Sequence, residues 1–423
     1  MIPYDHAVRL VRDAAGLQRA ETVSVAASTG RVLADAVRSG QCLPPFDNSA
    51  MDGFALRLAG DAADQGAEFD IRGWQAAGDD GAVADAGAWE IMTGARLPEG
   101  LDSVVPIEDV EVLQTADGRP TRIRLRAVVT PGQFVRRRGQ DVATGEQILA
   151  GGTLLDTNAV TLLHAIGIGT VSVRARPRVA IIATGKELVS DAAQALQSGQ
   201  IRDSNRPYLV ARLAAAGAEV VADVVVGDEV ERFNRALDEA LAAGAQIVLS
   251  TGAVSAGRYD FIPDALRAHG AQIVFHKVAV RPGKPLLFAV LADGTAYFGL
   301  PGNPASTAVG QRFFVEPMLR RMLGLVDEQG VQVALATDTA TPPGLRFHTR
   351  AVIQADASGR LTARPLAGQE SFRLQATVQA TGWAVLDGAG EQAAAGSAVQ
   401  VFSWGHADAL RFAAYVPAPQ EIT

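Results

Sequence analysis

Residues 178–188 read RVAIIATGKEL, and this stretch decides the fold because a β-branched, apolar run turns abruptly into glycine and charged side chains. The pattern predicts a buried strand over residues 179–183 that ends in a polar loop. Further strands are predicted over residues 219–226, 246–250 and 271–280, and apolar residues recur at helical spacing between them. This alternation continues to about residue 323 and predicts a doubly wound, parallel α/β sheet with helices on both faces.

The segments around residues 178–329 have different patterns. Residues 44–138 hold short strands separated by glycine, aspartate and proline, which predicts an inserted β-rich domain. Their flanks, residues 1–43 and 139–177, carry helical patterns and are predicted to pair as one N-terminal linking domain. Short strands broken by turns over residues 330–423 predict a small C-terminal β-barrel, with a sandwich as the alternative. We therefore expect four domains.

The composition of the chain excludes several functional classes. Of its 423 residues 48% are hydrophobic and 20% charged, which is typical of a globular chain. A formal net charge of -8 opposes non-specific binding to nucleic acid or to acidic lipid. A single cysteine, Cys42, excludes an internal disulfide framework, and the first residues lack a basic segment that leads into an apolar run. These two features together predict a cytoplasmic, reducing location. No apolar run approaches the roughly 20 residues of a membrane span, so we expect no transmembrane helix.

Polar or glycine-rich segments follow the predicted strands. They are TGKEL at 184–188, GDE at 227–229, STGAVSAG at 250–257, PGKP at 282–285 and LPGNP at 300–304. In an open parallel sheet, ligands bind outside the carboxyl ends of the strands. One such loop alone is more often a simple turn, but five at one edge favour a binding site. Stiff prolines, glycines and Lys284 make an anion the expected ligand.

Charged side chains in these loops suggest how a phosphate would be held. Asp228, Asp260 and Glu187 could bind Mg²⁺ through water and one or two carboxylates, although the two aspartates could equally cap helices. Lys277, Arg281 and Lys284 form a predicted cationic cluster, and alternation along one strand would put Lys277 and Arg281 on the same face.

A second set of polar segments lies in the β-rich region. It comprises PPFDNSAMDGFA at 44–55, IMTGA at 91–95 and RRRGQD at 136–141. A structural loop would explain most of the first segment, and three consecutive arginines are more often a solvated surface than a site. The six histidines show no metal-ligand spacing, and no Ser/His/Asp set is recognisable.

Taken together, these segments resemble the molybdopterin molybdenumtransferase family, known as MoeA in bacteria and represented by the E domain of gephyrin in animals. The segments from PPFDNSAMDGFA to LPGNP, with DSN at 203–205, occur in the family's order over nearly the whole chain. The resemblance implies a four-domain homodimer whose active site lies between the sheet domain of one subunit and the β-rich domain of the other. The implied reaction inserts molybdate into adenylylated molybdopterin, with Mg²⁺-dependent release of AMP, and yields molybdenum cofactor.

The resemblance also implies roles for individual residues. Asp52, Glu187, Asp228 and Asp260 would be catalytic, and Asp228 and Asp260 would bind Mg²⁺. The substrate-binding residues would be Thr93, Arg136, Asp141, Thr184, Gly185, Ser250, Gly252, Ser255, Lys277, Arg281, Lys284, Pro301, Pro304, Arg350 and Ser371. Asp52, Thr93, Arg136 and Asp141 would come from the partner subunit. Implied protein partners are the molybdopterin adenylyltransferase and molybdoenzyme chaperones.

The chain departs from the family pattern near the predicted site, where the family usually has an acidic residue close to Lys186, and at two further positions. Ala253 stands where the family usually has a second glycine, and Arg281 stands where lysine is frequent. These departures leave tungstate or a modified pterin open as the substrate. Two other functions remain as alternatives, an enzyme that adenylylates molybdopterin with ATP and a dimeric scaffold without activity.

Overall fold

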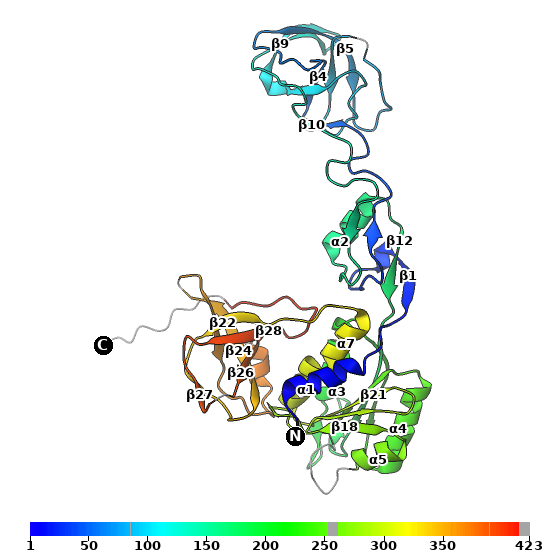
Figure 1. Ribbon diagram of the computed structural model, residues 1–423, viewed down its shortest axis with the longest axis vertical. Helices are drawn as coiled ribbons and strands as arrows, with labels where there is room; N and C mark the ends of the chain where they lie inside the picture. Colours follow the sequence, from blue (N-terminus) through cyan, green and yellow to red (C-terminus); the bar gives the residue numbers. More distant parts are fainter. Residues whose placement is uncertain (85, 253–260, 357, 389, 414–423) are drawn as a thin grey trace, which may run out of the picture. The chain divides into compact units, whose positions relative to one another are not determined.

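The computed structural model describes residues 1–84, 86–252, 261–356, 358–388 and 390–413 (Figure 1). Contacts within the chain divide it into two compact units. We call residues 1–21, 30–34 and 173–423 the large unit, and residues 22–29 and 35–172 the small unit. No helix in the described part of the chain is long and apolar enough to cross a membrane.

The large unit contains the predicted α/β sheet. Its strands lie in the order β16 (Glu219–Val226), β13 (Arg178–Thr184), β17 (Ile247–Thr251), β21 (Ala296–Leu300), β20 (Leu287–Val290) and β18 (Gln272–His276). The first four are parallel, whereas β20 runs antiparallel to both of its neighbours. The sheet is therefore mixed, and the start of β20 lies at the same edge as the carboxyl ends of the parallel strands.

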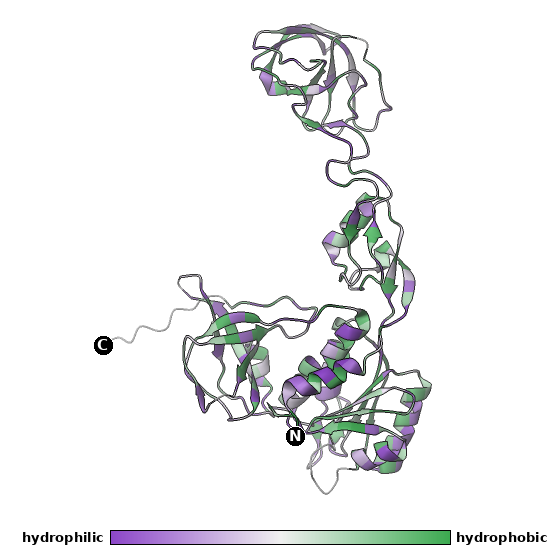
Figure 2. Ribbon diagram, in the orientation of Figure 1, coloured by the Kyte–Doolittle hydropathy of each residue, from purple (hydrophilic) through white to green (hydrophobic). Residues whose placement is uncertain are grey.

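Helices cover both faces of this sheet, as predicted. Val179 and Ile181 of β13 pack in one core, whereas Ala180 and Ile182 pack in another, because successive strand residues point to opposite faces. The first core includes α1 (Tyr4–Asp13), α3 (Asn205–Ala215), α6 (Pro304–Gly310), a π-helical segment (Gln311–Val315) and α7 (Glu316–Leu323). The second includes α4 (Val230–Ala242) and α5 (Ile262–Ala268). Both hydrophilic and hydrophobic residues lie along α1 (Figure 2), whose Ala7, Val8 and Val11 are buried.

The predicted strand over residues 271–280 is wrong as a single strand. Lys277 has a positive φ of 86°, so the extended chain breaks there and β18 ends at His276. Ile2 pairs with the break, since its N–H donates to the Lys277 carbonyl at 3.1 Å and its carbonyl accepts from Ala279 N–H at 2.9 Å. The next strand, β19 (Val280–Arg281), pairs with another sheet. Lys277 and Arg281 therefore do not share the face of one strand.

The C-terminal part of the large unit is the predicted barrel. Its strands are β22 (Val331–Leu335), β24 (Arg346–Ala355), β25 (Leu361–Pro365), β26 (Gly382–Asp387) and β28 (Ala398–Phe402). They close in the order β24-β25-β22-β28-β26 because β26 also pairs with β24. The sandwich alternative is excluded by this closure. A short helix, α8 (Gln375–Gln379), precedes β26.

The small unit is built around a second sheet. Its order is β7 (Ser103–Pro106), β4 (Gly53–Leu56), β6 (Ala88–Ile91), β5 (Glu68–Gln75), β9 (Arg119–Leu125) and β8 (Val110–Ala116). The same unit holds α2 (Thr157–Ala165), whose first turn is capped by the Asp156 carboxylate. Shorter strands elsewhere in the chain are β1 (Ala20–Ser24), β2 (Val37–Arg38), β3 (Asn48–Ser49), β10 (Val135–Arg136), β11 (Gln147–Leu149), β12 (Thr170–Arg174), β14 (Leu188–Val189), β15 (Ile201–Arg202), β23 (Thr339–Ala340) and β27 (Gln392–Ala393). The division into four domains stays a prediction. Helix α1, which the sequence assigned to the N-terminal linking domain, packs in the core of the α/β sheet.

Candidate functional site

The loops at the carboxyl edge of the α/β sheet are joined by backbone hydrogen bonds. Gly185 N–H donates to the Val226 carbonyl at 3.1 Å, which links the loops after β13 and β16. Gly252 N–H donates to the Leu300 carbonyl, also at 3.1 Å, which links the loops after β17 and β21. The polar segments predicted at this edge therefore gather in one place.

A cavity of about 560 Å³ lies at this edge. Thr184, Glu187, Gly252, Pro301 and Pro304 line it, and all five were predicted as site residues. The predicted loops that follow β13, β17 and β21 thus share one hollow in the protein. Ser250 is different, because it is fully buried inside β17 and does not line the cavity.

Two carboxylates of this edge are available to a ligand. Glu187 is half-buried in the cavity wall, and Asp228 is exposed in front of α4. Within the described part of the chain, neither side chain has a hydrogen bond or ion pair. The residue that directly precedes α4 is Glu229, and its side chain makes no capping hydrogen bond. Asp260 and Ser255 lie outside the described residues.

The described residues contain no group of three or more His, Cys, Asp or Glu side chains that could hold a metal ion alone. Mg²⁺ bound to a phosphate needs only one or two protein carboxylates, because waters and phosphate oxygens complete its shell. Glu187 and Asp228, in loops that follow adjacent strands, fit that smaller requirement.

The predicted cations differ in their surroundings. Lys284 is exposed beside the cavity-lining Pro285, and its carbonyl accepts from Val278 N–H at 2.9 Å, which fixes its backbone. Arg281 is also exposed, with its guanidinium carbon 5.5 Å from the centre of the Phe347 ring. Neither Lys277 nor Lys284 forms an ion pair with any residue that the structure describes. Lys284 therefore keeps its charge available for an anion.

Arg350 and Ser371 both make hydrogen bonds that hold one loop of the barrel in place. Arg350 is 1% exposed, and its guanidinium donates to the carbonyls of Gly368, Glu370 and Arg373. The Arg350 side chain, which was predicted to bind substrate, therefore makes these hydrogen bonds to the loop over residues 366–374. Ser371 Oγ accepts a hydrogen bond of 2.9 Å from the Asn303 side chain, so this loop reaches the LPGNP segment.

Two asparagines have roles that the sequence did not reveal. Asn205 is the first residue of α3, and Ser204 occupies the capping position. The Asn205 side chain donates to the Gly302 carbonyl at 2.6 Å. Asn303 joins the same loop to the barrel. The motif positions were visible in DSN and LPGNP, but no spacing rule indicates these long-range bonds.

The second predicted set comes together within the small unit. Thr93 N–H donates to the Asp52 carboxylate at 2.6 Å, and this hydrogen bond lowers the pKa of Asp52. Arg136 of β10 pairs with Asn48 of β3. Asp141 is exposed, and its N–H donates to the Leu43 carbonyl at 2.9 Å. Three segments far apart in sequence therefore form one polar surface.

The run of three arginines is partly structural. Arg137 forms an ion pair of 2.8 Å with Asp47, and Arg138 N–H donates to the same carboxylate at 2.7 Å. Arg136 and Arg138 have exposed side chains. The interpretation of the three arginines as a solvated surface thus holds for part of this run. Arg136 has an exposed side chain on β10, which pairs with β3 in the segment that also contains Asp52.

Three matches to known protein regions cover most of the chain. Residues 2–167 match the MoeA N-terminal region (domain I and II), residues 180–321 a probable molybdopterin binding domain, and residues 332–404 the MoeA C-terminal region (domain IV). The chain belongs to the MoeA family.

Curated MoeA relatives are similar over nearly their full length. The molybdopterin molybdenumtransferase of Synechococcus elongatus is 36% identical over 390 residues, which cover 90% of this chain and 94% of that protein. Molybdopterin molybdenumtransferase 2 of Mycobacterium tuberculosis is 34% identical, with 93% and 97% covered. The crystal structure of a molybdopterin biosynthesis MoeA protein from Pyrococcus horikoshii OT3 matches with a TM-score of 0.78 and 25% identity over 95% of this chain and all of that one. These enzymes confirm the expected family and fold.

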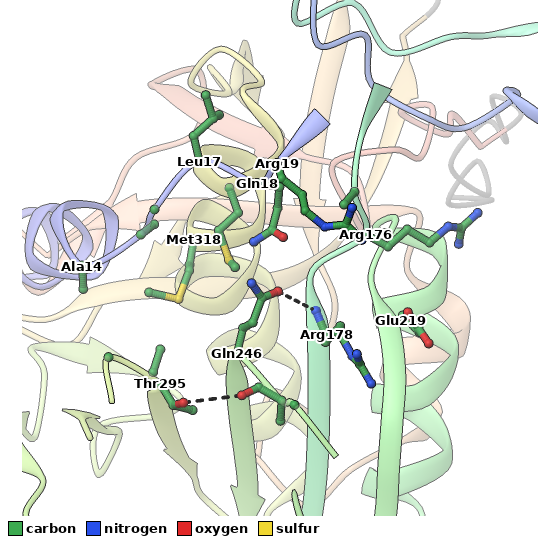
Figure 3. Close-up of a pocket in the computed structure, with 18 of the residues that line it drawn as sticks. Ala14, Leu17, Gln18, Arg19, Arg176, Arg178, Glu219, Gln246, Thr295 and Met318 are labelled. Carbon is green, nitrogen blue, oxygen red and sulfur yellow. Dashed lines mark hydrogen bonds between the residues drawn. The ribbon is translucent and has the colours of Figure 1, made fainter. Parts of the chain in front are cut away.

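The MoeA motifs also distinguish the carboxyl-edge cavity from a cavity at the opposite edge of the sheet. A cavity of about 610 Å³ opens where β13, β16 and β17 begin, between Gln18, Arg178 and Gln246 (Figure 3). Arg178 N–H donates to the Gln246 side chain there at 3.1 Å. None of the predicted site residues lines this cavity. The smaller cavity at the carboxyl edge, which carries the MoeA loops, is the candidate active site.

Proposed function

We propose that this protein inserts molybdate into adenylylated molybdopterin, with Mg²⁺-dependent cleavage of the phosphoanhydride and release of AMP, to give molybdenum cofactor. Membership of the MoeA family places it among the enzymes of molybdenum cofactor biosynthesis. The observation that carries this proposal is the carboxyl-edge cavity, which is lined by Glu187 and the MoeA loops. Lys284 directly precedes the cavity-lining Pro285 and has no ion pair with any residue that the structure describes.

The chemistry of this edge suits a substrate that is an anion throughout the reaction. Lys284 would attract the phosphate or molybdate oxygens, and the rigid loops would hold it in place without further ordering on binding. Charge that develops as the phosphoanhydride opens is best stabilised by groups that are already in position. Glu187 and Asp228 would hold Mg²⁺ together with substrate oxygens and water. When bound, Mg²⁺ would neutralise charge on the phosphates.

We also propose that the working site is completed by a second copy of the chain. Asp52, Thr93, Arg136 and Asp141 form an exposed polar surface of the small unit. A homodimer would let this surface of one copy serve the carboxyl-edge cavity of the other. The cytoplasmic location and the association with molybdopterin adenylyltransferase or molybdoenzyme chaperones stay predictions.

The decisive experiment measures AMP release from adenylylated molybdopterin in the presence of Mg²⁺. We expect release only when molybdate is added, and molybdopterin that carries the metal should appear in equal amount. Release of AMP without molybdate would contradict the proposal. A parallel reaction with tungstate tests the alternative metal oxyanion, and pyrophosphate release from ATP and molybdopterin would instead indicate an adenylyltransferase.

A further inference from the structure

Phe372 is an aromatic residue that lies at the polar candidate site with most of its surface exposed. It lines the carboxyl-edge cavity, yet 63% of its surface is accessible to solvent. It comes from the barrel loop over residues 366–374, whereas the other lining residues come from the α/β domain. An aromatic ring held at a ligand cavity offers a flat apolar face on which a planar ligand can stack.

The barrel holds the loop around Phe372 through a buried cation. The guanidinium of Arg350 donates to the carbonyls of Gly368 at 2.9 Å, of Glu370 at 3.2 Å and of Arg373. The side-chain amide of Gln369 donates to the Arg350 carbonyl at 2.9 Å. Hydrogen bonds to a charged donor are stronger than neutral ones, so the backbone on both sides of the ring is firmly placed.

The α/β domain holds the same loop through Ser371. This residue, directly before the aromatic one, accepts a side-chain hydrogen bond of 2.9 Å from Asn303. Its carbonyl accepts from Ala305 N–H at 2.9 Å, in the first turn of α6. Phe372 is thus presented to the cavity by a loop that is anchored to two domains. Its exposure follows from a fixed backbone and not from a loose loop.

We propose that Phe372 is a specificity-determining residue that stacks against the heteroaromatic ring of the substrate. The Arg373 guanidinium carbon lies over the phenyl ring, 5.6 Å from its centre, and the ring still keeps most of its surface exposed at the cavity. A flat ring with an attached phosphate would place the phosphate at the polar loops and the ring on Phe372. Identification of that ligand as a pterin or adenine nucleotide rests on the proposed function.

An apolar protein contact is the competing explanation. Leu374 and Val378, which follow Phe372 in sequence, are 48% and 86% exposed, so the three could form a docking strip. Only Phe372 of the three lines the cavity, and only Phe372 has a planar ring. Stacking therefore predicts an effect of Phe372 alone, whereas docking predicts similar effects of Phe372 and Val378. This difference makes Val378→Ala the matched control.

The test compares ligand binding by calorimetry in the full-length wild type, Phe372→Ala, Phe372→Leu, Phe372→Trp and Val378→Ala. The probes are AMP, neopterin monophosphate, ribose 5-phosphate, which carries a phosphate but no aromatic ring, and molybdate. Stacking of one ring on an aromatic side chain changes affinity by about 5- to 150-fold. We expect Phe372→Ala to lose that factor for AMP, for the pterin or for both, and the affected probe identifies the ring. Phe372→Trp should restore binding, and ribose 5-phosphate and molybdate should bind as before.

Several outcomes would overturn the proposal. They are absence of AMP and pterin binding in the wild type, unchanged affinities in Phe372→Ala, full binding in Phe372→Leu, or an equal loss for the ring-free probes. An equal effect of Val378→Ala, with a change of oligomeric state, would assign the strip to protein contact. Because these measurements need no turnover, a protein that binds the ring probes but releases no AMP would contradict the proposed reaction and leave the stacking result intact.

Discussion

Gly252 packs so closely against Thr184 that a β-carbon at position 252 would lie 2.7 Å from both the carbonyl oxygen and the hydroxyl oxygen of Thr184. Gly252 also has a φ of +89°, a conformation that side chains disfavour. The Thr184 hydroxyl donates to the Thr251 carbonyl at 2.9 Å, so the contact cannot open without breaking a buried hydrogen bond. The cavity wall between β13 and β17 therefore depends on glycine at this position.

We expect Gly252→Ala to destabilise the protein and to reduce molybdate-dependent AMP release. The matched control is Gly294→Ala, because Gly294 has a φ of +87° but a β-carbon added there would have no atom within 4 Å. Both variants carry the backbone strain, about 1–2 kcal/mol. Only Gly252→Ala adds the steric conflict, which costs about 1–3 kcal/mol more. If urea denaturation gave the two variants equal unfolding free energies, the close approach of Gly252 to Thr184 would make no contribution to stability.

Lys284→Ala should weaken substrate binding or turnover without unfolding the protein. A charged hydrogen bond contributes roughly 1.5 to 3 kcal/mol, so kcat/KM should fall about ten- to 150-fold. Arg235→Ala is the control, because Arg235 is an exposed cation on α4, the helix that follows β16. Kinetics that remain at wild-type values in Lys284→Ala would remove this side chain from the site.

Much of the fold could be predicted from the sequence, because the spacing of apolar residues along the chain indicates which face of each helix or strand is buried. The apolar run after Arg178 predicted β13, and loops rich in glycine and proline predicted the edge where Gly252 and Pro301 now line one cavity. The break at Lys277 was missed because it depends on pairing with Ile2, a partner far away in sequence. No local pattern encodes such a contact.

The candidate site was only partly predictable for the same reason. Glu187 was expected at the cavity it lines because polar side chains at strand ends converge in any parallel sheet. The position of Phe372 was not predicted, since it depends on the Arg350 and Asn303 hydrogen bonds that fix its loop. Arg350 itself was expected near the substrate, and a charged residue in a strand gives no indication in the sequence that it binds carbonyls.

Glu316 anchors the end of the barrel to the helices of the large unit. Its buried carboxylate accepts from His406 N–H at 2.8 Å and from the Gln311 side chain at 2.9 Å, and it pairs with Arg312 at 3.0 Å. Although burial opposes ionisation, the Arg312 charge helps to hold the pKa of Glu316 below its usual value. We expect Glu316→Ala to lower the unfolding free energy by about 3–5 kcal/mol, because it leaves Arg312 buried with less compensation.

The control for Glu316 is Asp264→Ala. Asp264 is 85% exposed and pairs with Arg267 at 2.6 Å, and such surface pairs contribute at most about 1 kcal/mol. Urea unfolding of both variants at neutral pH gives the comparison. A loss at Glu316 no larger than the loss at Asp264 would mean that the buried anchor is dispensable.

His348 makes the stability of the large unit depend on pH. It is fully buried against Phe313, with the ring centres 4.3 Å apart, and burial together with the Arg346 charge lowers its pKa from 6.5 to about 3. In the unfolded chain His348 takes up a proton near pH 6.5, whereas in the folded protein it takes one up only near pH 3. This contribution to stability is therefore complete above pH 6.5 and is lost as the pH falls toward 3.

We expect the unfolding free energy of the wild type to fall by as much as about 1.4 kcal/mol per pH unit in that window from His348 alone. His348→Leu removes the titrating group, so its stability should change less between about pH 7.5 and pH 5. Urea denaturation of both proteins at each pH measures the difference. Parallel pH profiles would show that His348 does not titrate on unfolding.

A composite active site predicts that two variants of low activity restore each other. Asp52 lies in the small unit and Lys284 in the large unit, so a site shared between copies takes each residue from a different chain. A dimer of Asp52→Ala with Lys284→Ala would contain one site with both substitutions and one site with neither. Random pairing makes about half of the dimers mixed, so co-expression should give about a quarter of the wild-type activity. Glu187→Ala paired with Lys284→Ala is the control, because both substitutions affect the same side and no intact site can form. Activity in the co-expressed pair no higher than in either variant alone would place Asp52 and Lys284 of one chain in the same site, or would remove Asp52 from it.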